Sequence, residues 1–377
     1  MTISILSSVP YAFLRQRPHQ LAHEFLRAGV DVTFIDPPGN WLRTLMHRRT
    51  GSGGPRRPAG LRRVSLQSLR VPVLDIPLWP ANATLPARRS TLKRRVFAQP
   101  PSRPHAMILT NPLHEVLVPE GSVDLLCYDC VDDPALFVAA YGPAFYDHRD
   151  RLVRKSALVF ATAERLEQEL LRRYPEATVL RIPNGVDPEW FQRHGAVPDT
   201  GLGDDQRPIV GYMGALYEWL DVELLCTLAR HMPEVRFVLV GPLRGLRNES
   251  ALRSASNITL MGPVPYERVP GIIARFAIGM IPFTEGPLAD STDPIKLYEY
   301  FALGKPVVAT RMHQLSQFAE AGLARCASEA GEFAQYIRDF LQSDTLERQQ
   351  ARRRVAQEHS WRRSAETIIN ALERHGI

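Results

Sequence analysis

Residues 291–310 hold the combination of residue types in this sequence that best suits a phosphate-bearing ligand. Thr292 and Asp293 are common helix N-caps, and Pro294 fits a first helical turn because its missing N–H has no intrahelical partner there. A helix that starts in this way presents unused backbone N–H groups, beginning at Ile295, and such groups bind anions. The sequence therefore predicts an anion site at the start of this helix.

Two charged side chains follow on one face of the same helix. Lys296 lies in the first turn and Glu299 three residues later, so their backbones are separated by roughly 4.5 Å along the helix axis. The phosphates of a nucleoside diphosphate can meet Lys296, while the vicinal diol of its ribose can donate to the Glu299 carboxylate. This spacing predicts a nucleotide site. The alternative is an ordinary helix, turn and strand of an α/β core.

The segment continues into a turn and a buried strand, because Gly304 suits a helix C-terminus and Pro306 cannot continue the helix. Strand and helix patterns alternate through both halves of the chain, which predicts parallel sheets with helices on both faces. The predicted strands are Ile3–Ser7, Val30–Ile35, Ala106–Thr110, Val123–Tyr128, Ala157–Thr162, Val179–Ile182, Ile209–Met213, Val235–Val240, Ile258–Leu260, Ala277–Pro282 and Val307–Ala309. The predicted helices are Pro18–Ala28, Ala163–Arg173, Asp221–His231, Tyr266–Arg275, Gly331–Gln342, Thr345–His359 and Trp361–His375.

A polar stretch divides the two halves of this pattern. Residues 195–207 contain three glycines and several aspartates, which is typical of an interdomain linker. We therefore expect an α/β protein with two Rossmann-like domains, each built on a doubly wound parallel sheet, over residues 1–194 and 208–357. Residues 358–377 are expected to form a C-terminal helix that packs back on the first domain. A chain of 377 residues is long enough for two such cores.

The spacing of Glu299, Gly304 and the Pro-Val-Val run at 306–308 resembles the nucleotide-sugar site of GT-B glycosyltransferases, especially the retaining enzymes of family 4. Residues 184–187 similarly resemble the Asn-Gly-Val-Asp segment that closes the N-terminal domain in that family. The resemblance includes a sub-branch with bacterial teichuronic-acid-type and other cell-envelope polysaccharide glycosyltransferases. It implies two domains that face a central cleft, with the acceptor on the first domain and the donor on the second.

Two departures from the family pattern change which residues can bind the donor. Ser291 stands where the family usually has another glutamate, so Asp290 or Asp293 is a candidate for the lost contact with the donor sugar. Gly214 follows a predicted strand, where its lack of a side chain lets the backbone approach a phosphate. The family's Arg and Lys after this turn are missing here, so we expect Lys296 to supply the positive charge.

Four further candidates follow strands or begin a helix. Arg244 follows a strand of the second domain and is a candidate phosphate ligand, or else a surface loop residue. Asp132 follows a strand of the first domain, at the sheet edge where ligands bind, and is a candidate catalytic contact to the donor sugar or acceptor hydroxyl. Its alternative is a helix cap. Arg17 and His19 begin the first helix and are candidate acceptor ligands, although a histidine at a helix start is commonly a cap.

The resemblance implies transfer of a sugar from a nucleotide-sugar, with UDP as the expected nucleotide, to a saccharide or lipid-linked acceptor. It also implies retention of configuration. We expect no cofactor and no metal, because the sequence contains no Asp-x-Asp triplet and Lys296 can neutralise the leaving diphosphate. Two rival functions remain: a nucleotide-sugar epimerase of the same fold, and a non-catalytic nucleotide-sugar-binding protein, which the serine at position 291 favours.

Charge is unevenly distributed along the chain. The segment from Arg43 to Arg103 contains fourteen Arg and Lys residues but one acid, Asp75. This predicts an anionic partner, either a membrane surface or the acceptor, unless the segment is a solvated loop. Nucleic acid is not expected, because the segment has few aromatic residues and no nucleic-acid-binding motif. No apolar run reaches 18 residues and no signal peptide is recognisable, so we expect a cytoplasmic protein, with peripheral association at the inner face of the membrane.

Overall fold

The computed structural model divides into two compact units, each of which is described separately. Unit 1 comprises Met1–Pro183 and Trp361–Ile377, and unit 2 comprises Asn184–Ser360. The stretch predicted as a linker, 195–207, belongs to unit 2 by this division. The structure describes residues 1–37, 57–66, 90, 92, 94–97, 104–133, 142–196, 201–243 and 245–377. Most of the basic segment between Arg43 and Arg103, and the candidate Arg244, lie outside these residues.

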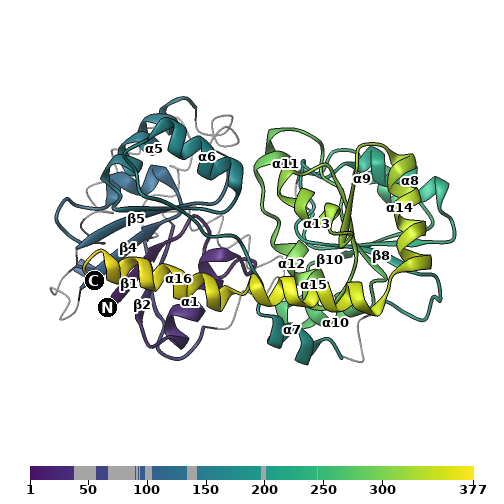
Figure 1. Ribbon diagram of the computed structural model, residues 1–377, viewed down its shortest axis with the longest axis horizontal. Helices are drawn as coiled ribbons and strands as arrows, with labels where there is room; N and C mark the ends of the chain where they lie inside the picture. Colours follow the sequence, from purple (N-terminus) through teal and green to yellow (C-terminus); the bar gives the residue numbers. More distant parts are fainter. Residues whose placement is uncertain are drawn as a thin grey trace. The chain divides into compact units, whose positions relative to one another are not determined.

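Unit 1 is built on a parallel sheet (Figure 1). Within the described residues its seven strands are hydrogen-bonded in the order β3-β2-β1-β4-β5-β6-β7, and every neighbouring pair is parallel. The order reverses at β1, so the carboxyl ends of β1 and β4 flank the switch point where such sheets bind ligands. The strands are β1 (Thr2–Leu6), β2 (Asp31–Asp36), β3 (Arg62–Ser65), β4 (His105–Leu109), β5 (Leu125–Cys130), β6 (Leu158–Ala161) and β7 (Val179–Arg181).

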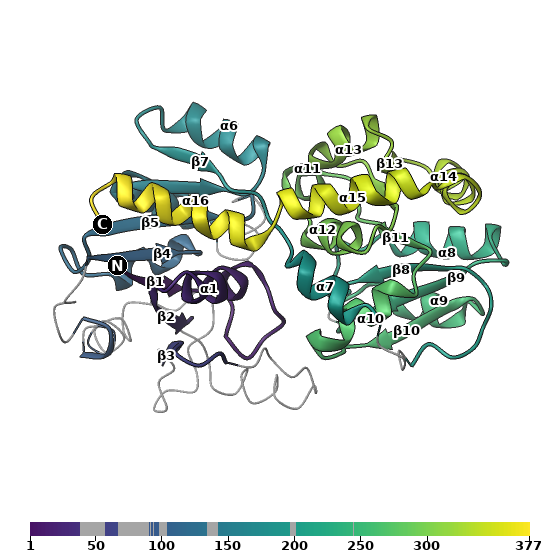
Figure 2. The same cartoon turned by 60° about the horizontal axis from the view of Figure 1, so that its bottom comes forward.

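Helices cover both faces of this sheet, with α1 and α16 on one face and α5 and α6 on the other (Figure 1). α1 has Pro18 in its first turn and ends before Gly29, whose φ of +79° suits glycine. The last helix, α16, lies along α1 (Figure 2). The helices are α1 (Arg17–Arg27), η1 (Pro112–Leu117), α5 (Ala144–Lys155), α6 (Glu164–Arg173) and α16 (Trp361–Arg374).

Unit 2 repeats this architecture. Its described residues form a six-stranded sheet in the order β10-β9-β8-β11-β12-β13, again with parallel neighbours. The order reverses between β8 and β11. The strands are β8 (Ile209–Met213), β9 (Arg236–Val240), β10 (Ile258–Gly262), β11 (Ile278–Ile281), β12 (Val307–Thr310) and β13 (Ala324–Ala327). The helices are α7 (Pro188–His194), α8 (Val222–His231), α9 (Glu249–Ser254), η2 (Tyr266–Arg268), α10 (Val269–Ala274), α11 (Pro287–Ser291), α12 (Ile295–Ala302), η3 (His313–Leu315), α13 (Ser316–Glu320), α14 (Ala330–Ser343) and α15 (Leu346–Glu358).

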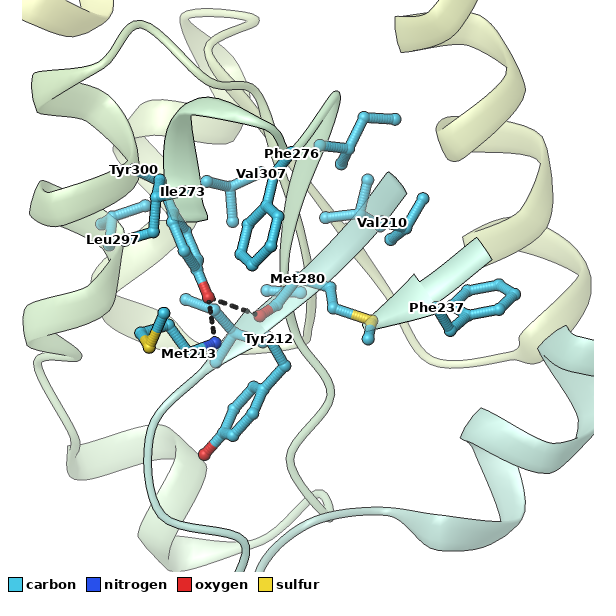
Figure 3. Packing of buried hydrophobic residues seen from close by; sticks show 14 of the residues in the cluster. Val210, Tyr212, Met213, Phe237, Ile273, Phe276, Met280, Leu297, Tyr300 and Val307 are labelled. Atoms are coloured by element: carbon cyan, nitrogen blue, oxygen red, sulfur yellow. Dashed lines mark hydrogen bonds between the residues drawn. The ribbon is translucent and has the colours of Figure 1, made fainter. Parts of the chain in front are cut away.

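Gly279 of β11 allows α12 to sit close to the sheet of unit 2. A Cβ atom on Gly279 of β11 would lie 2.4 Å from the Tyr300 ring of α12, so only glycine fits there. The Tyr300 hydroxyl accepts a hydrogen bond from the Met213 amide at 2.9 Å and donates to the Met280 carbonyl at 3.5 Å (Figure 3). Tyr300 therefore fixes α12 to the ends of the two strands that flank the switch point.

The prediction of two doubly wound parallel sheets is confirmed. The sequence reasoning missed several elements, among them β3, which lies in the basic segment, the short strand β13, and helix α5. Each is short or rich in charged residues, so its hydrophobic pattern is weak: β3 has the sequence Arg-Arg-Val-Ser and α5 carries six charged residues other than histidine.

Candidate functional site

The loops that follow β8 and β11 meet at the switch point of unit 2. The Asp221 amide donates to the Pro282 carbonyl at 2.9 Å, and the Thr284 amide donates to the Trp219 carbonyl at 2.8 Å. These bonds join the loops across the point where the strand order reverses, which is the edge of the sheet where doubly wound folds hold ligands.

Helix α12 begins beside this edge. Its N-cap is Pro294, with extended backbone angles and no side-chain cap, which corrects the prediction that Thr292 or Asp293 caps it. Pro294 therefore precedes the helix instead of lying in its first turn. In the described part of the chain, the amides of Ile295 and Lys296 donate to no protein acceptor. The predicted helix start thus offers two N–H donors to an anion.

The Lys296 ammonium lies against aromatic rings. Its Nζ is 5.1 Å from the centroid of the Tyr212 ring and 4.7 Å from that of Phe283. Among the described residues it makes no ion pair with a carboxylate. Burial lowers the pKa of Lys296 to about 8, and the nearby Glu299 carboxylate opposes this shift. Such an ammonium has lost hydration without gaining a direct counter-ion, and a diphosphate would supply one.

Gly214 and Gly241 shape the space beside this ammonium. A Cβ atom on Gly214 would lie 3.2 Å from Lys296 Cε, and φ at Gly214 is +146°, a region that favours glycine. A Cβ atom on Gly241, after β9, would lie 1.9 Å from the Gly214 carbonyl oxygen. The loop after β9 therefore packs directly against the loop after β8. Any side chain at position 241 would displace the loop that contains Gly214.

Glu299 lies one turn further along α12 and is 8 % exposed. Its charge reaches Lys296, as the pKa of Lys296 shows, so the structure brings together the two side chains that the sequence predicted as a pair. Tyr212 and Phe283, which line this site, were missed. Their signal in the sequence was weak, since single aromatic residues at strand ends are common in cores.

Asp293 supports the helix. Its Oδ2 accepts from the Asn184 amide at 2.6 Å and its Oδ1 from the Tyr298 hydroxyl at 2.8 Å, while Asn184 Nδ2 donates to its carbonyl at 2.7 Å. These bonds tie residue 184 to the start of α12, so we do not propose a donor contact for Asp293. Ser291 is also buried, and its hydroxyl donates to the Pro287 carbonyl at 2.7 Å.

The predicted acceptor ligands of unit 1 are buried and form internal contacts. Arg17 is 1 % exposed; it pairs with Asp129 through Nε at 2.9 Å and donates to the Pro183 carbonyl at 3.1 Å. His19 is fully buried: its Nδ1 accepts from the Gln16 amide at 3.1 Å, and burial lowers its pKa to about 4. Both side chains are thus held by contacts within unit 1, and a direct contact of either one with the acceptor stays a prediction.

Asp132 follows β5 at the carboxyl edge of the unit 1 sheet, as predicted, and is partly exposed. Burial, together with the Asp129 and Asp133 carboxylates, raises the pKa of Asp132 to about 6. The nearby thiols are inert, since burial raises the pKa of Cys127 to about 12 and that of Cys130 to about 11.

Among the described residues, no group of three or more His, Cys, Asp or Glu side chains could hold a metal ion. None of the helices described could span a bilayer.

Residues 221–370 match a protein family described as glycosyl transferase-like. Over 209 residues the chain is 26 % identical to the teichuronic acid biosynthesis glycosyltransferase TuaH of Bacillus subtilis (strain 168), covering 52 % of this chain and 53 % of the relative. The chain thus matches about half the length of that relative.

Solved structures are similar over almost the whole chain. Sucrose-phosphate synthase from Thermosynechococcus elongatus has a TM-score of 0.73 at 16 % identity, covering 99 % of this chain and 98 % of that one. HepE from Anabaena, in complex with UDP and glucose, has a TM-score of 0.70 at 15 % identity, covering 99 % of both chains. WaaG, a glycosyltransferase involved in lipopolysaccharide biosynthesis, has a TM-score of 0.67 at 14 % identity, covering 98 % of both. The predicted fold and the predicted resemblance are both confirmed.

Proposed function

We propose that this chain, which has the GT-B fold and a glycosyl transferase-like domain, transfers a sugar from a nucleotide-sugar to an acceptor held by unit 1. The observation that carries the proposal is the Lys296 ammonium. It lies at a helix start with two available amides, at the switch point of a doubly wound sheet, and pairs with no carboxylate among the described residues. An anionic leaving group bound here would accept hydrogen bonds from the two amides and would give the ammonium a counter-ion.

The donor binds along the first turns of α12. Its diphosphate accepts hydrogen bonds from the Ile295 and Lys296 amides and from the Lys296 ammonium, with the Gly214 backbone alongside. Its ribose hydroxyls donate to the Glu299 carboxylate. UDP is the proposed nucleotide. HepE from Anabaena has been solved with UDP and glucose, and a structure titled trehalose-6-phosphate from E. coli holds UDP-2-fluoro glucose, which supports this choice.

The reaction breaks the bond between the anomeric carbon and the diphosphate oxygen. The acceptor hydroxyl oxygen bonds to that carbon on the same face, its proton passes to the departing diphosphate oxygen, and the products are a glycoside and UDP. Negative charge grows on the diphosphate as the bond breaks, so Lys296 and the two amides stabilise the transition state more than the ground state. We propose that these groups take the place of a metal ion. Asp132 contacts the acceptor hydroxyl or the donor sugar.

The acceptor is proposed to be a saccharide or a lipid-linked saccharide of the cell envelope. The names of TuaH and WaaG, which refer to teichuronic acid and lipopolysaccharide synthesis, support this class. The basic segment from Arg43 to Arg103 contains fourteen basic residues and a single acidic residue. This excess of positive charge supports a location at the cytoplasmic face of an anionic membrane.

Release of nucleoside diphosphate tests the proposal. The full chain is incubated with a panel of sugar nucleotides and envelope glycans, and free UDP and new glycoside are measured by mass spectrometry, with and without EDTA. We expect acceptor-dependent UDP release that EDTA leaves within about twofold. Interconversion of sugar nucleotides without release would indicate an epimerase, and tight UDP binding without turnover would indicate a binding protein. Loss of activity in EDTA that Mg²⁺ or Mn²⁺ restores would contradict the metal-free mechanism.

UDP affinity is expected to fall as pH rises through about 8. Because the pKa of Lys296 is lowered to about 8, the free protein loses this ammonium above that pH, whereas an ordinary lysine would stay charged to about pH 10. Calorimetric titration of UDP between pH 7 and 10 measures the effect. The matched variant Lys296→Arg keeps its charge throughout, so its affinity should not show this fall. An equal fall in both proteins would mean that another group titrates.

A further inference from the structure

Three arginine side chains of unit 1 gather around a buried tyrosine near the carboxyl ends of β1 and β2. Tyr11 lies in the loop between β1 and α1 and is 2 % exposed. Burial raises the pKa of Tyr11 to about 12, while the charges of Arg15, Arg63 and Arg57 act in the opposite direction. The charges of all three guanidinium groups therefore reach the Tyr11 hydroxyl.

Asp36, the last residue of β2, fixes one side of this cluster. Its Oδ1 accepts from the Tyr11 amide at 2.7 Å, and its Oδ2 lies 2.6 Å from Nη2 of Arg63. Arg63 also stacks over the Tyr11 ring, with Cζ 5.6 Å from the ring centroid, and its side chain stays 32 % exposed. One guanidinium is thus held in place by a fully buried carboxylate while it still faces solvent.

His23 holds the second guanidinium without neutralising it. Nη2 of Arg15 lies 3.0 Å from His23 Nδ1, and because arginine can only donate, Nδ1 is the acceptor. The ring proton is then on Nε2, which donates to the Tyr11 hydroxyl at 2.9 Å. Burial, with the charge of Arg15, lowers the pKa of His23 to about 3, so the ring is neutral at physiological pH.

The charged groups named above sum to a positive charge. Arg15, Arg57 and Arg63 are cations, and the Asp36 carboxylate pairs with Arg63. The sequence from residue 37 to residue 74 contains no Asp or Glu. One guanidinium group can donate two parallel hydrogen bonds to a phosphate group. Several guanidinium groups close together therefore suit a ligand with two negative charges.

We infer that this cluster is an anion-binding site of unit 1 that takes a phosphate or pyrophosphate group. It lies where β1 and β2 end, on the ligand-binding edge of the sheet. In combination with the proposed function, on which this part of the inference rests, the group belongs to the acceptor, so the substrate class is a saccharide carried on a phosphate or pyrophosphate. The same chemistry is present in a phospholipid headgroup, and the experiment separates the two sources.

Binding of inorganic pyrophosphate to the full chain tests the site, with saturating UDP present to fill unit 2. The test variant is Arg57→Ser, because Arg57 is exposed and its loss leaves the Asp36 pair intact. The matched control is Arg172→Ser, an exposed arginine on α6 of the same unit. We expect pyrophosphate to bind the wild-type chain and the control equally, with affinity at least about fivefold lower in Arg57→Ser, the scale of one lost charged hydrogen bond.

Sedimentation with phosphatidylglycerol and phosphatidylcholine vesicles gives the second arm. Pyrophosphate binding that depends on Arg57, with equal sedimentation of wild type and Arg57→Ser, supports an acceptor phosphate. Dependence on Arg57 in the vesicle arm alone overturns it in favour of a headgroup. If Arg57→Ser and Arg172→Ser bind pyrophosphate equally, or if the wild-type chain binds none, the site itself is overturned. Absence of UDP binding would instead defeat the proposed function, and the comparison of Arg57→Ser with Arg172→Ser would still decide this inference.

Discussion

Replacing Lys296 with alanine is expected to lower kcat by roughly 10²–10³-fold, the effect of removing one preorganised group that stabilises transition-state charge. Negative charge on the diphosphate is greatest as the sugar departs, so kcat should fall more than KM rises. The side chain makes no direct ion pair with a carboxylate among the described residues, so its removal breaks no salt bridge. Steady-state kinetics with a donor and acceptor that support UDP release measure the change.

Two controls define the Lys296 result. Lys155→Ala removes an exposed ammonium of unit 1 and should leave kcat unchanged. Phe283→Leu keeps the lysine but removes an aromatic ring that holds it, so a smaller loss of kcat is expected. If Lys296→Ala raised KM and left kcat intact, the lysine would contribute to binding alone, and the proposed stabilisation of the leaving group would be wrong.

Replacing Glu299 with alanine is expected to weaken UDP binding by about 5- to 150-fold, since charged hydrogen bonds to the ribose contribute about 1–3 kcal/mol. Calorimetry with UDP and 2′-deoxy-UDP gives a sharper comparison. The wild-type chain should bind the deoxy compound more weakly than UDP, whereas Glu299→Ala should discriminate much less between the two nucleotides. The substitution and the loss of the 2′-hydroxyl remove the same hydrogen bond, so their effects should not add.

The matched control for Glu299 is Glu267→Ala, which removes an exposed carboxylate of the same unit. It should bind UDP like the wild type. Full discrimination between the two nucleotides by Glu299→Ala would show that another group holds the ribose 2′-hydroxyl, and unchanged affinity for UDP would remove Glu299 from the site.

The sequence predicted the fold because local signals agreed with one another. In the segment from residue 291 to residue 310, Gly304 ends α12 with φ of +72° and Val307 begins a fully buried strand, as their residue types require. The proximity of Lys296 and Glu299 was also predictable, since both lie on a single helix and their separation depends only on helix geometry.

The roles of polar residues whose partners are distant in sequence could not be predicted in this way. Arg17 is buried against Asp129, which lies 112 residues further along the chain. Asp293 accepts a hydrogen bond from the amide of Asn184, which is 109 residues away in the sequence. Residue type and spacing showed that these side chains are polar, but only the folded structure shows that they are already satisfied. The aromatic rings beside Lys296 likewise come from two different strand ends, β8 and β11.

Hydrogen exchange with and without UDP tests the central claim, that the diphosphate binds at the start of α12. Mass spectrometry of the full chain should show slower exchange on UDP addition in peptides that contain the amides of Ile295 and Lys296, with a further effect at Gly214. The protection should be largely lost in Lys296→Ala and unchanged in Glu267→Ala. UDP binding that protects other segments and leaves exchange at residues 295 and 296 unaltered would contradict the account.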